Sequence, residues 1–218
     1  MPTILTYGDS NTHGTPPTPS ADLYLRLGAE DRWPCVMQRA LGPDWTLIEE
    51  GLPGRTTVLN DPVTGPTMNG LLGLPMALRS HGPIDWLTIM LGTNDCQIHH
   101  GVTADQITGG LAALLAFALS PEMQARHGSF RILVIAPPPV VETGTWVAEF
   151  HRGGAKSQAM IPLFRDLAAS RGLAFLDASQ HIAVSPVDGV HFDAAAHHCL
   201  GQEVAKVIAN AGQPLLFA

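Results

Sequence analysis

The chain has 218 residues, with 12 Lys and Arg against 19 Asp and Glu and a formal net charge of −7. This length suits one larger domain, and an acidic balance without any basic cluster excludes the surface that nucleic acids or anionic membranes require. Charged residues make up only 14% of the chain, against about 25% in an average globular domain, which predicts that some surface is covered in a homo-oligomer.

The N-terminal sequence has neither the basic segment nor the long apolar segment of a signal peptide. The longest apolar run, residues 109–119, is shorter than the roughly 18 residues that a membrane span needs. Three cysteines stand far apart without a CxxC pair, which argues against a disulfide framework or a zinc ribbon. We therefore expect a cytoplasmic protein that contacts no membrane.

Short apolar segments alternate with longer amphipathic ones along the whole chain, as in successive βα units around a parallel sheet. The predicted strands span residues 3–7, 46–49, 86–91, 131–136 and 174–176. The predicted helices span residues 32–41, 69–80, 103–126, 155–170 and 194–211. Because the strands are nearly continuous in Ile, Leu, Val and Met, we expect helices on both faces of the sheet.

Predicted helix ends and irregular segments complete this pattern. Thr103 and Asp193 are suited to begin helices, and glycines that suit helix ends are Gly128, Gly172 and Gly212. Three segments have no regular period, namely residues 15–30, 60–67 and 137–154. Open α/β sheets bind ligands beyond the carboxyl ends of their strands, so these segments are candidate walls of a site. No repeat or linker divides the chain, which predicts one domain over residues 1–218.

The first predicted strand ends in the sequence Gly8-Asp9-Ser10-Asn11-Thr12-His13-Gly14. A serine at a strand-to-helix turn, between glycines that permit a tight turn, can present its hydroxyl at the sheet edge. This is a position for a nucleophile. The simpler alternative is that Ser10 only caps a helix, so the interpretation depends on partners elsewhere in the chain.

Suitable partners stand near the C-terminus, in the sequence Asp188-Gly189-Val190-His191-Phe192. A serine hydroxyl attacks well only when an imidazole takes its proton, and a carboxylate fixes the imidazole tautomer. Asp188, three residues before His191, can fold back to reach the other ring nitrogen. A surface turn with an incidental Asp–His contact is the alternative, and the presence of Ser10 weakens it.

Two further blocks supply candidate hydrogen-bond donors for an oxyanion. Asn94 follows the most apolar strand in Leu91-Gly92-Thr93-Asn94-Asp95, and a donor of this kind contributes about 3–4 kcal/mol in hydrolases where it has been removed. Gly54, in Glu49-Glu50-Gly51-Leu52-Pro53-Gly54-Arg55-Thr56-Thr57, lets the backbone approach a ligand and offer its amide. Taken alone, Asn94 is more often a turn former.

These four blocks, in this order, resemble those of the SGNH, or GDSL-like, hydrolases: a GDS turn, a second-block glycine, a GxND block and a C-terminal DxxH. The resemblance runs from Gly8 to His191. The stretches EEGLPGRTT, MLGTND, PPP at 137–139 and DGVHF are similar to the arylesterase and acyltransferase branch known from mycobacteria and rhizobia. Each block alone is a weak signal, whereas four in register are a strong one.

The resemblance implies a three-layer α/β/α sandwich with a five-stranded parallel, flavodoxin-like sheet. It also implies a Ser10–His191–Asp188 triad, an oxyanion hole made by the amides of Ser10 and Gly54 and the side chain of Asn94, and a closed homo-oligomer. The chain departs from the pattern where Asn11 replaces Leu and His13 stands where this branch often has Trp, which bears on the acyl pocket. The chain has no GxSxG serine, which argues against an ordinary α/β-hydrolase elbow.

We therefore predict a serine esterase that acts on short-chain or aryl carboxylic esters through an acyl-enzyme, with acyl transfer to an alcohol as a further activity. The predicted partners are a small ester and an alcohol acceptor, and no cofactor or metal is expected. The alternatives within the fold are a carbohydrate acetyl esterase and a thioesterase or lysophospholipase. The alternative of another class is a non-catalytic ligand-binding module.

Other constellations are assigned to structure rather than to chemistry. The pairs His99-His100 and His197-His198, with Cys96 and Cys199 nearby, match no zinc spacing, and adjacent histidines are expected to point to different faces. Cys96 has no His–carboxylate pair of its own. A leucine-rich stripe from Leu111 to Leu119 predicts a core helix face, and Trp33 is expected in the core. Trp146 and Phe150 could line an acyl channel or an oligomer contact.

Overall fold

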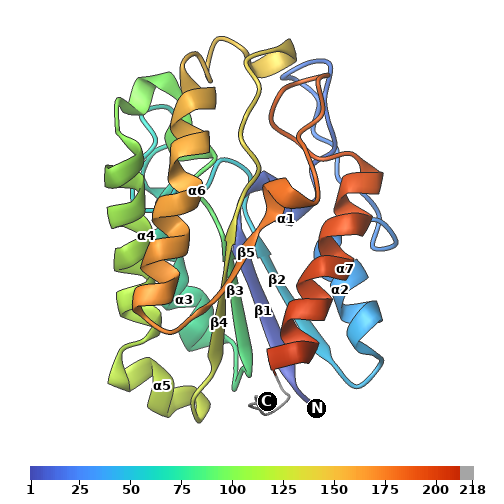
Figure 1. Ribbon diagram of the computed structural model, residues 1–218, viewed down its shortest axis with the longest axis vertical. Helices are drawn as coiled ribbons and strands as arrows, with labels where there is room; N and C mark the ends of the chain where they lie inside the picture. The colour runs from blue at the N-terminus through green and yellow to red at the C-terminus, as the bar shows by residue number, and fades with distance from the viewer. Residues whose placement is uncertain (212–218) are drawn as a thin grey trace, which may run out of the picture.

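The computed structural model describes residues 1–211 and consists of a central parallel sheet between two layers of helices (Figure 1). The strands are β1 Thr3–Gly8, β2 Thr46–Gly51, β3 Trp86–Met90, β4 Arg131–Ala136 and β5 Ala174–Asp177. The helices are α1 Ser10–His13, α2 Trp33–Leu41, α3 Gly70–Ser80, α4 Ala104–Ala118, α5 Pro121–His127, α6 Gly153–Ser170 and α7 Ala194–Ala211. The strand order is β2-β1-β3-β4-β5, which confirms the predicted three-layer α/β/α fold with five parallel strands.

Each face of the sheet has its own hydrophobic core. One core joins the sheet to α3, α4 and α6 and includes the predicted stripe of leucines on α4. The other joins it to α2 and α7, with Trp33 fully buried as expected. The close packing of α2 on α7 requires Gly201, because a Cβ there would lie 2.6 Å from the Cβ of Val36.

The helix predicted over residues 103–126 is wrong in its length, because the structure divides it into α4 and α5. Pro121 lacks an N–H and its ring would clash with the preceding turn, so it begins a helix rather than continuing one. The Ser120 hydroxyl accepts a hydrogen bond from the Met123 amide at 3.4 Å and caps the new helix. Sequence periodicity missed the break because apolar residues continue on both sides of it.

The predicted helix ends are mostly found. Thr103 begins α4 in a capping box with Gln106, and Gly128 ends α5 in the left-handed conformation. The Asp193 carboxylate accepts a hydrogen bond from the Ala196 amide at 2.8 Å at the start of α7. Gly172 follows α6 with a φ of +64°. Gly212 lies outside the described residues.

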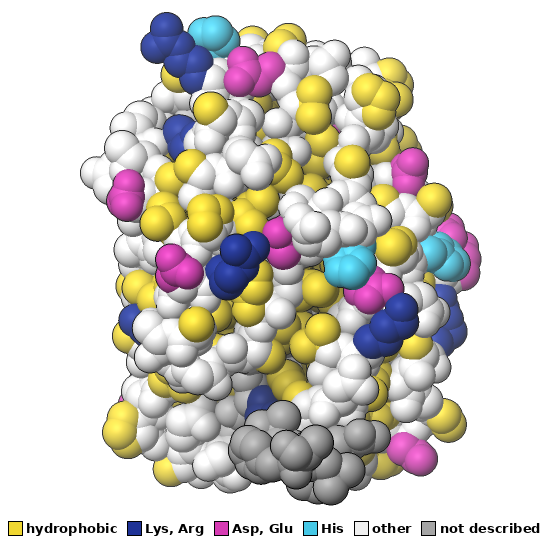
Figure 2. Space-filling model, in the orientation of Figure 1, with side chains coloured by type: hydrophobic (Ala, Val, Ile, Leu, Met, Phe, Trp, Pro, Cys, Tyr) yellow, Lys and Arg dark blue, Asp and Glu magenta, His cyan; other side chains and the backbone are white. Residues whose placement is uncertain are grey.

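The surface carries few charges, in keeping with the composition. On the face that Figure 2 shows, charged side chains are scattered and hydrophobic side chains are exposed between them. None of the helices within residues 1–211 is long and apolar enough to cross a membrane.

Candidate active site

The turn between β1 and α1 places Ser10 at the carboxyl edge of the sheet. A Cβ on Gly8 would lie 2.0 Å from the Thr12 hydroxyl and 2.8 Å from the Met90 carbonyl oxygen, so this turn needs a glycine. The Asp9 carboxylate accepts a hydrogen bond from the Asn11 amide at 2.9 Å and caps α1. Ser10 is therefore the first residue of a short helix whose geometry is fixed on both sides.

The structure brings Ser10, His191 and Asp188 into one hydrogen-bonded row. The His191 Nε2 atom lies 3.0 Å from the Ser10 hydroxyl oxygen, and the His191 Nδ1 atom lies 2.7 Å from a carboxylate oxygen of Asp188. These residues come from opposite ends of the chain, 181 positions apart for Ser10 and His191. With Nδ1 protonated and donating to Asp188, the Nε2 lone pair faces the serine hydroxyl.

Asp188 is fully buried and its two oxygens accept four hydrogen bonds. Besides the His191 ring, the donors are the amides of His191 at 2.9 Å, Val190 at 3.0 Å and Thr18 at 2.9 Å. Burial alone would raise the pKa of Asp188, but the hydrogen bonds and the charge of His191 outweigh it and hold that pKa below its ordinary value. Asp188 is thus kept ionised while it orients the imidazole.

Gly54 and Asn94 lie around the same cavity as Ser10. The Asn94 side chain donates one hydrogen bond to the Arg55 carbonyl at 3.0 Å and its oxygen accepts one from Gln97 at 3.2 Å. These contacts fix the amide orientation and leave its second N–H hydrogen for another acceptor. Gly54 has a φ of +85°, which a side chain would strain.

The cavity above Ser10 has a volume of about 210 Å³. Its lining combines aliphatic and aromatic side chains with a few polar groups: Ser10, Thr15, Thr18, Leu23, Tyr24, Leu25, Pro53, Gly54, Asn94, Gln97, Trp146, Phe150, Val190 and His191. Two of the three predicted walls, residues 15–30 and 137–154, contribute to it, and Trp146 and Phe150 both line it. Segment 60–67 contributes no lining residue, so its prediction as a wall is wrong.

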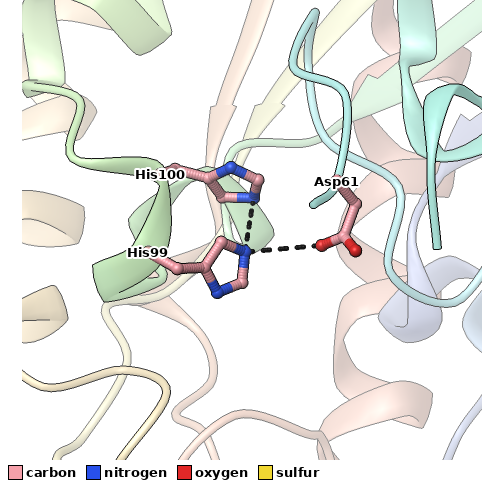
Figure 3. A group of neighbouring side chains, drawn as sticks. All are labelled: Asp61, His99 and His100. Carbon is pink, nitrogen blue, oxygen red and sulfur yellow. Dashed lines mark hydrogen bonds and ion pairs between the residues drawn. The ribbon is translucent and has the colours of Figure 1, made fainter. Parts of the chain in front are cut away.

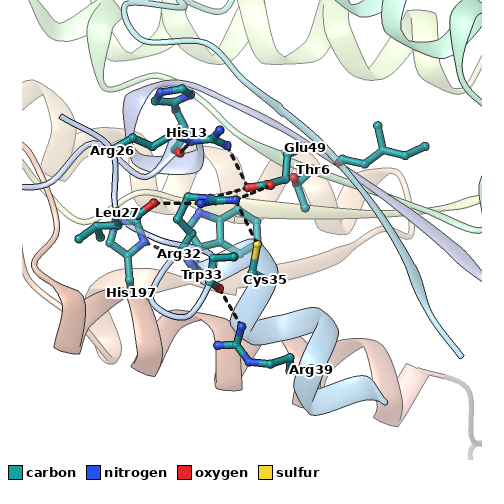
Figure 4. A network of polar contacts seen from close by, with 12 residues as sticks. Thr6, His13, Arg26, Leu27, Arg32, Trp33, Cys35, Arg39, Glu49 and His197 are labelled. Atoms are coloured by element: carbon teal, nitrogen blue, oxygen red, sulfur yellow. Dashed lines mark hydrogen bonds and ion pairs between the residues drawn. The ribbon is translucent and has the colours of Figure 1, made fainter. Parts of the chain in front are cut away.

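A network of arginines tethers the first wall to the sheet (Figure 4). The Glu49 carboxylate, at the end of β2, binds Arg26 at 3.3 Å and Arg32 at 2.8 Å. Arg26 also donates to the His13 carbonyl at 2.8 Å, and Arg32 to the Leu27 carbonyl at 2.9 Å. Residues 26–32 are therefore held against both β2 and α1, which positions the wall beside Ser10.

Asn11 connects the turn between β1 and α1 to the segment that carries His191, a role that the sequence did not reveal. Its side chain donates to the Val190 carbonyl at 3.1 Å and accepts from the Phe192 amide at 3.3 Å. The two contacts flank His191 on either side. Asn11 is 1% exposed, so both bonds are shielded from water. The sequence pointed here only through the departure from Leu at this position.

Asp95 connects the Asn94 block to the Gly54 block and was also not foreseen. The buried Asp95 carboxylate accepts hydrogen bonds from the Thr57 amide, at 3.1 and 3.0 Å to its two oxygens, and from the Thr57 hydroxyl. Burial raises the pKa of Asp95 to about 6, although these hydrogen bonds oppose the shift. The contact holds the two segments that carry Asn94 and Gly54 at a fixed separation.

The two histidine pairs behave differently. His197 is fully buried, burial lowers its pKa to about 4, and its Nδ1 atom accepts from the Trp33 amide at 3.3 Å. His198 instead faces solvent and pairs with Asp31 at 3.0 Å. The expectation of divergent rings is wrong for the other pair, because the Nε2 atoms of His99 and His100 lie 3.2 Å apart. Both stand in a short 3-10 turn, Ile98–His100, at the surface.

Cys96 fits the structural role assigned to it. The residue is fully buried, and burial raises the pKa of its thiol to about 12. A thiol that stays protonated is a poor nucleophile and a poor metal ligand. Its sulfur packs 3.9 Å from the Met160 sulfur.

Comparison with known proteins gives one family and several solved structures. A model of the GDSL-like Lipase/Acylhydrolase family matches residues 6–199. Est24, a carbohydrate acetylesterase from Sinorhizobium meliloti, is 34% identical with a TM-score of 0.92, covering 97% of this chain and 100% of its own. The M. smegmatis aryl esterase is 33% identical with a TM-score of 0.91, covering 96% and 99%. No curated protein sequence matches the chain significantly.

Proposed function

The chain belongs to the GDSL-like lipase/acylhydrolase family, and we propose that it is a serine esterase that acts on short-chain or aryl carboxylic esters. In this proposal Ser10 is the nucleophile, His191 the general base and then the general acid, and Asp188 the carboxylate that orients His191. The observation that carries the proposal is the row of hydrogen bonds from Ser10 through His191 to Asp188, at 3.0 and 2.7 Å, in the wall of a cavity.

The first half of the reaction forms an acyl-enzyme. His191 Nε2 takes the proton from the Ser10 hydroxyl as the oxygen attacks the ester carbonyl carbon, and the carbonyl oxygen becomes an oxyanion. The proposed donors to this oxyanion are the amides of Ser10 and Gly54 and the side chain of Asn94. When the tetrahedral intermediate collapses, the alcohol leaves with the proton from His191, and the acyl group stays on Ser10.

The second half releases the acyl group to water or to an alcohol. His191 takes a proton from the incoming molecule, whose oxygen attacks the acyl carbon, and then returns this proton to Ser10. Water gives the carboxylic acid, whereas an alcohol gives a new ester. The aliphatic and aromatic lining near Ser10, which includes Leu25, Trp146 and Phe150, supports acyl transfer because it favours a less polar acceptor over water.

The size of the cavity supports a short acyl group. Its volume of about 210 Å³ is below the roughly 300–1,000 Å³ of sites for drug-sized ligands. We expect acetyl and propionyl esters of p-nitrophenol to react faster than octanoyl esters. A preference for the octanoyl ester would instead favour a thioesterase or lysophospholipase.

A carbohydrate acetyl esterase is the second candidate, because Est24 is described as one. The cavity of this chain also has polar lining residues that offer donors and acceptors for sugar hydroxyls, namely Thr15, Thr18, Tyr24 and Gln97. Release of acetate from acetylated sugars, compared with release from aryl acetates at equal concentration, separates the two candidates.

Replacement of the nucleophile tests the proposal directly. Ser10→Ala should abolish turnover of p-nitrophenyl acetate, and a fluorophosphonate should label the native protein but not this variant. Ser170→Ala, at an exposed hydroxyl that only donates to the Leu167 carbonyl, is the matched control and should keep both properties. Retained turnover in Ser10→Ala would overturn the assignment, and absence of labelling in the native protein would favour a ligand-binding module.

We also propose that the chain forms a homo-oligomer. Leu23, Tyr24 and Leu25 at the cavity rim are 46%, 77% and 44% exposed, so an apolar rim is available for burial against another copy. Light scattering at micromolar concentration should give a multiple of the 23.1 kDa chain mass, and the monomer mass would contradict the proposal.

A further inference from the structure

Asp61, His99 and His100 bring three ligand atoms to one point of the surface (Figure 3). The His99 Nε2 atom lies 3.2 Å from the His100 Nε2 atom and 3.4 Å from an Asp61 carboxylate oxygen. One ligand atom from each residue lies within 4.8 Å of the other two. Within residues 1–211, this is the one place where three or more His, Cys, Asp or Glu side chains converge in this way.

The carboxylate is oriented by its own loop. One Asp61 oxygen accepts hydrogen bonds from the amides of Val63 at 2.8 Å and Thr64 at 2.7 Å and from the Thr64 hydroxyl at 3.0 Å. Backbone hydrogen bonds in both directions between Asp61 and Gly65 close the loop. The second oxygen is thereby directed at His99, as outer-sphere hydrogen bonds direct carboxylates in metal sites.

Hydrogen bonds alone cannot pair the His99 Nε2 atom with both of its neighbours at once. The His99 Nε2 atom has two partners, and a single N–H hydrogen at this nitrogen can point directly at only one of them. If His99 Nε2 carries no hydrogen, its lone pair faces the carboxylate. A cation at the centre accepts lone pairs from all three atoms at once and removes this conflict.

The distances favour a tetrahedral ion. Zinc binds His nitrogen and carboxylate oxygen at about 2.0–2.2 Å, which sets neighbouring ligand atoms about 3.3–3.6 Å apart in a tetrahedron. Octahedral coordination at the same bond lengths would bring neighbouring atoms to about 2.8–3.1 Å. The observed 3.4 Å falls in the tetrahedral range and outside the octahedral one, whereas the observed 3.2 Å lies between the two ranges.

We propose that Asp61, His99 and His100 bind a zinc-type divalent cation, with a fourth position open to solvent. The Asp61 and His99 side chains are 14% and 30% exposed, which gives an ion access from solution. The ion joins loop 60–67 to turn 98–100, and that turn follows directly after Asn94 and Gln97 in the chain. The bound ion holds these two segments together, and it takes no part in the reaction at Ser10.

Zinc titration of tag-free, chelator-treated protein by calorimetry tests this site. We expect one ion per chain with a micromolar or tighter Kd, and binding at least tenfold weaker in His99→Ala, His100→Ala and Asp61→Asn. His198→Ala is the matched control, because His198 also belongs to an adjacent pair and contacts an aspartate, and it should bind as the native protein does. Cys199→Ser tests the partly exposed thiol as a competing ligand and should also leave binding unchanged.

Two further measurements test zinc binding without any use of catalytic activity. Co²⁺ in place of Zn²⁺ should give the intense visible absorption of a tetrahedral site, and the ion should raise the Tm of the native protein but not that of Asp61→Asn. Ser10→Ala should bind zinc normally, so a failed esterase proposal would leave this site untouched. Absence of stoichiometric binding, or equal binding in native protein and all three ligand variants confirmed folded by circular dichroism, would overturn the site.

Discussion

His191 and His99 each contact an aspartate, and they use their ring nitrogens in opposite ways. His191 gives each nitrogen a different partner, with Asp188 on Nδ1 and Ser10 on Nε2. His99 directs two partners, Asp61 and His100, to the same nitrogen. The arrangement at His191 suits proton transfer between Ser10 and the imidazole, whereas the arrangement at His99 brings the lone pairs of three side chains close enough to bind one cation.

Burial separates the two sites further. The side chains of His191 and Asp188 are 8% and 0% exposed, against 30% and 14% for His99 and Asp61. Low exposure strengthens each hydrogen bond and keeps water from competing for the imidazole. Greater exposure instead leaves room for a hydrated ion to enter. A His–Asp contact therefore says little about chemistry until the second nitrogen and the solvent access are known.

Among the changes predicted for the residues that support Ser10, removal of the charge of Asp188 should lower the reaction rate most. Asp188→Asn should lower kcat for p-nitrophenyl acetate by about 10³–10⁴-fold, because the amide no longer stabilises the imidazolium and favours the wrong tautomer. The measurement is kcat against pH. Asp31→Asn removes a partly exposed aspartate from His198 and is the matched control, with a rate expected within twofold of native. An unchanged rate in Asp188→Asn would show that Asp188 does not orient His191 for proton transfer.

Loss of the Asn11 contacts should have an intermediate effect, because it moves His191 without changing its chemistry. Asn11→Leu leaves the Val190 carbonyl and the Phe192 amide without their buried partner, at a cost of about 1–3 kcal/mol in the free energy of unfolding. We expect kcat to fall about 10–100-fold with little change in KM, since a small displacement of a catalytic group is enough.

The control for Asn11 is Asn60→Ala, at a side chain that only accepts from Asn69 near the surface. Urea denaturation and fluorophosphonate labelling rates should both distinguish the two variants. If Asn11→Leu lost stability but labelled at the native rate, Asn11 would be a structural residue without a positioning role.

The smallest expected effect concerns Asp95, a buried carboxylate held by Thr57 and by no histidine. Its pKa is raised by burial to about 6, whereas hydrogen bonds overcome burial and lower the pKa at Asp188. A carboxyl with a raised folded pKa contributes stability below its unfolded pKa, and this contribution is lost as the pH rises through about 6. Between pH 4.5 and 7, native protein should therefore lose about 1–2 kcal/mol relative to Asp95→Asn.

Urea denaturation of both proteins at the two pH values measures this difference. Asp9, whose pKa burial also raises to about 6, is present in both proteins, so the part of its contribution that comes from burial cancels, whereas the part that comes from the charge of Asp95 is counted with Asp95. Parallel stability curves would show that Asp95 titrates alike in the folded and unfolded chain.

The layers of the fold could be predicted from the sequence because each strand is a short apolar run followed by a turn. Thr103 and Gly128 marked helix ends for the same local reason, whereas the break at Pro121 was hidden by apolar residues on both sides of it. Local patterns report local conformation, so they identify elements better than they identify breaks within them.

The residues of the hydrogen-bonded row in the candidate site could be predicted from the sequence, whereas the residues that support this row could not. Ser10, Asp188 and His191 have spacing or turn signals of their own, and Asn94 stands at a strand end. The contacts of Asn11 with Val190 and Phe192, and of Asp61 with His99, join segments whose relative placement follows from loop conformations. No periodicity encodes such pairs, because each depends on the packing of the whole edge of the sheet.

The position of His191, directly before α7, has a consequence for synthesis of the protein. Helix α7 packs on α2, with Gly201 against Trp33 and Val36. Because Ser10 precedes His191 by 181 positions, a nascent chain carries the proposed nucleophile long before it carries the proposed base. Reactivity toward a fluorophosphonate should thus appear only after the segment that carries His191 has been synthesised and has packed beside Ser10, so it can report this folding step.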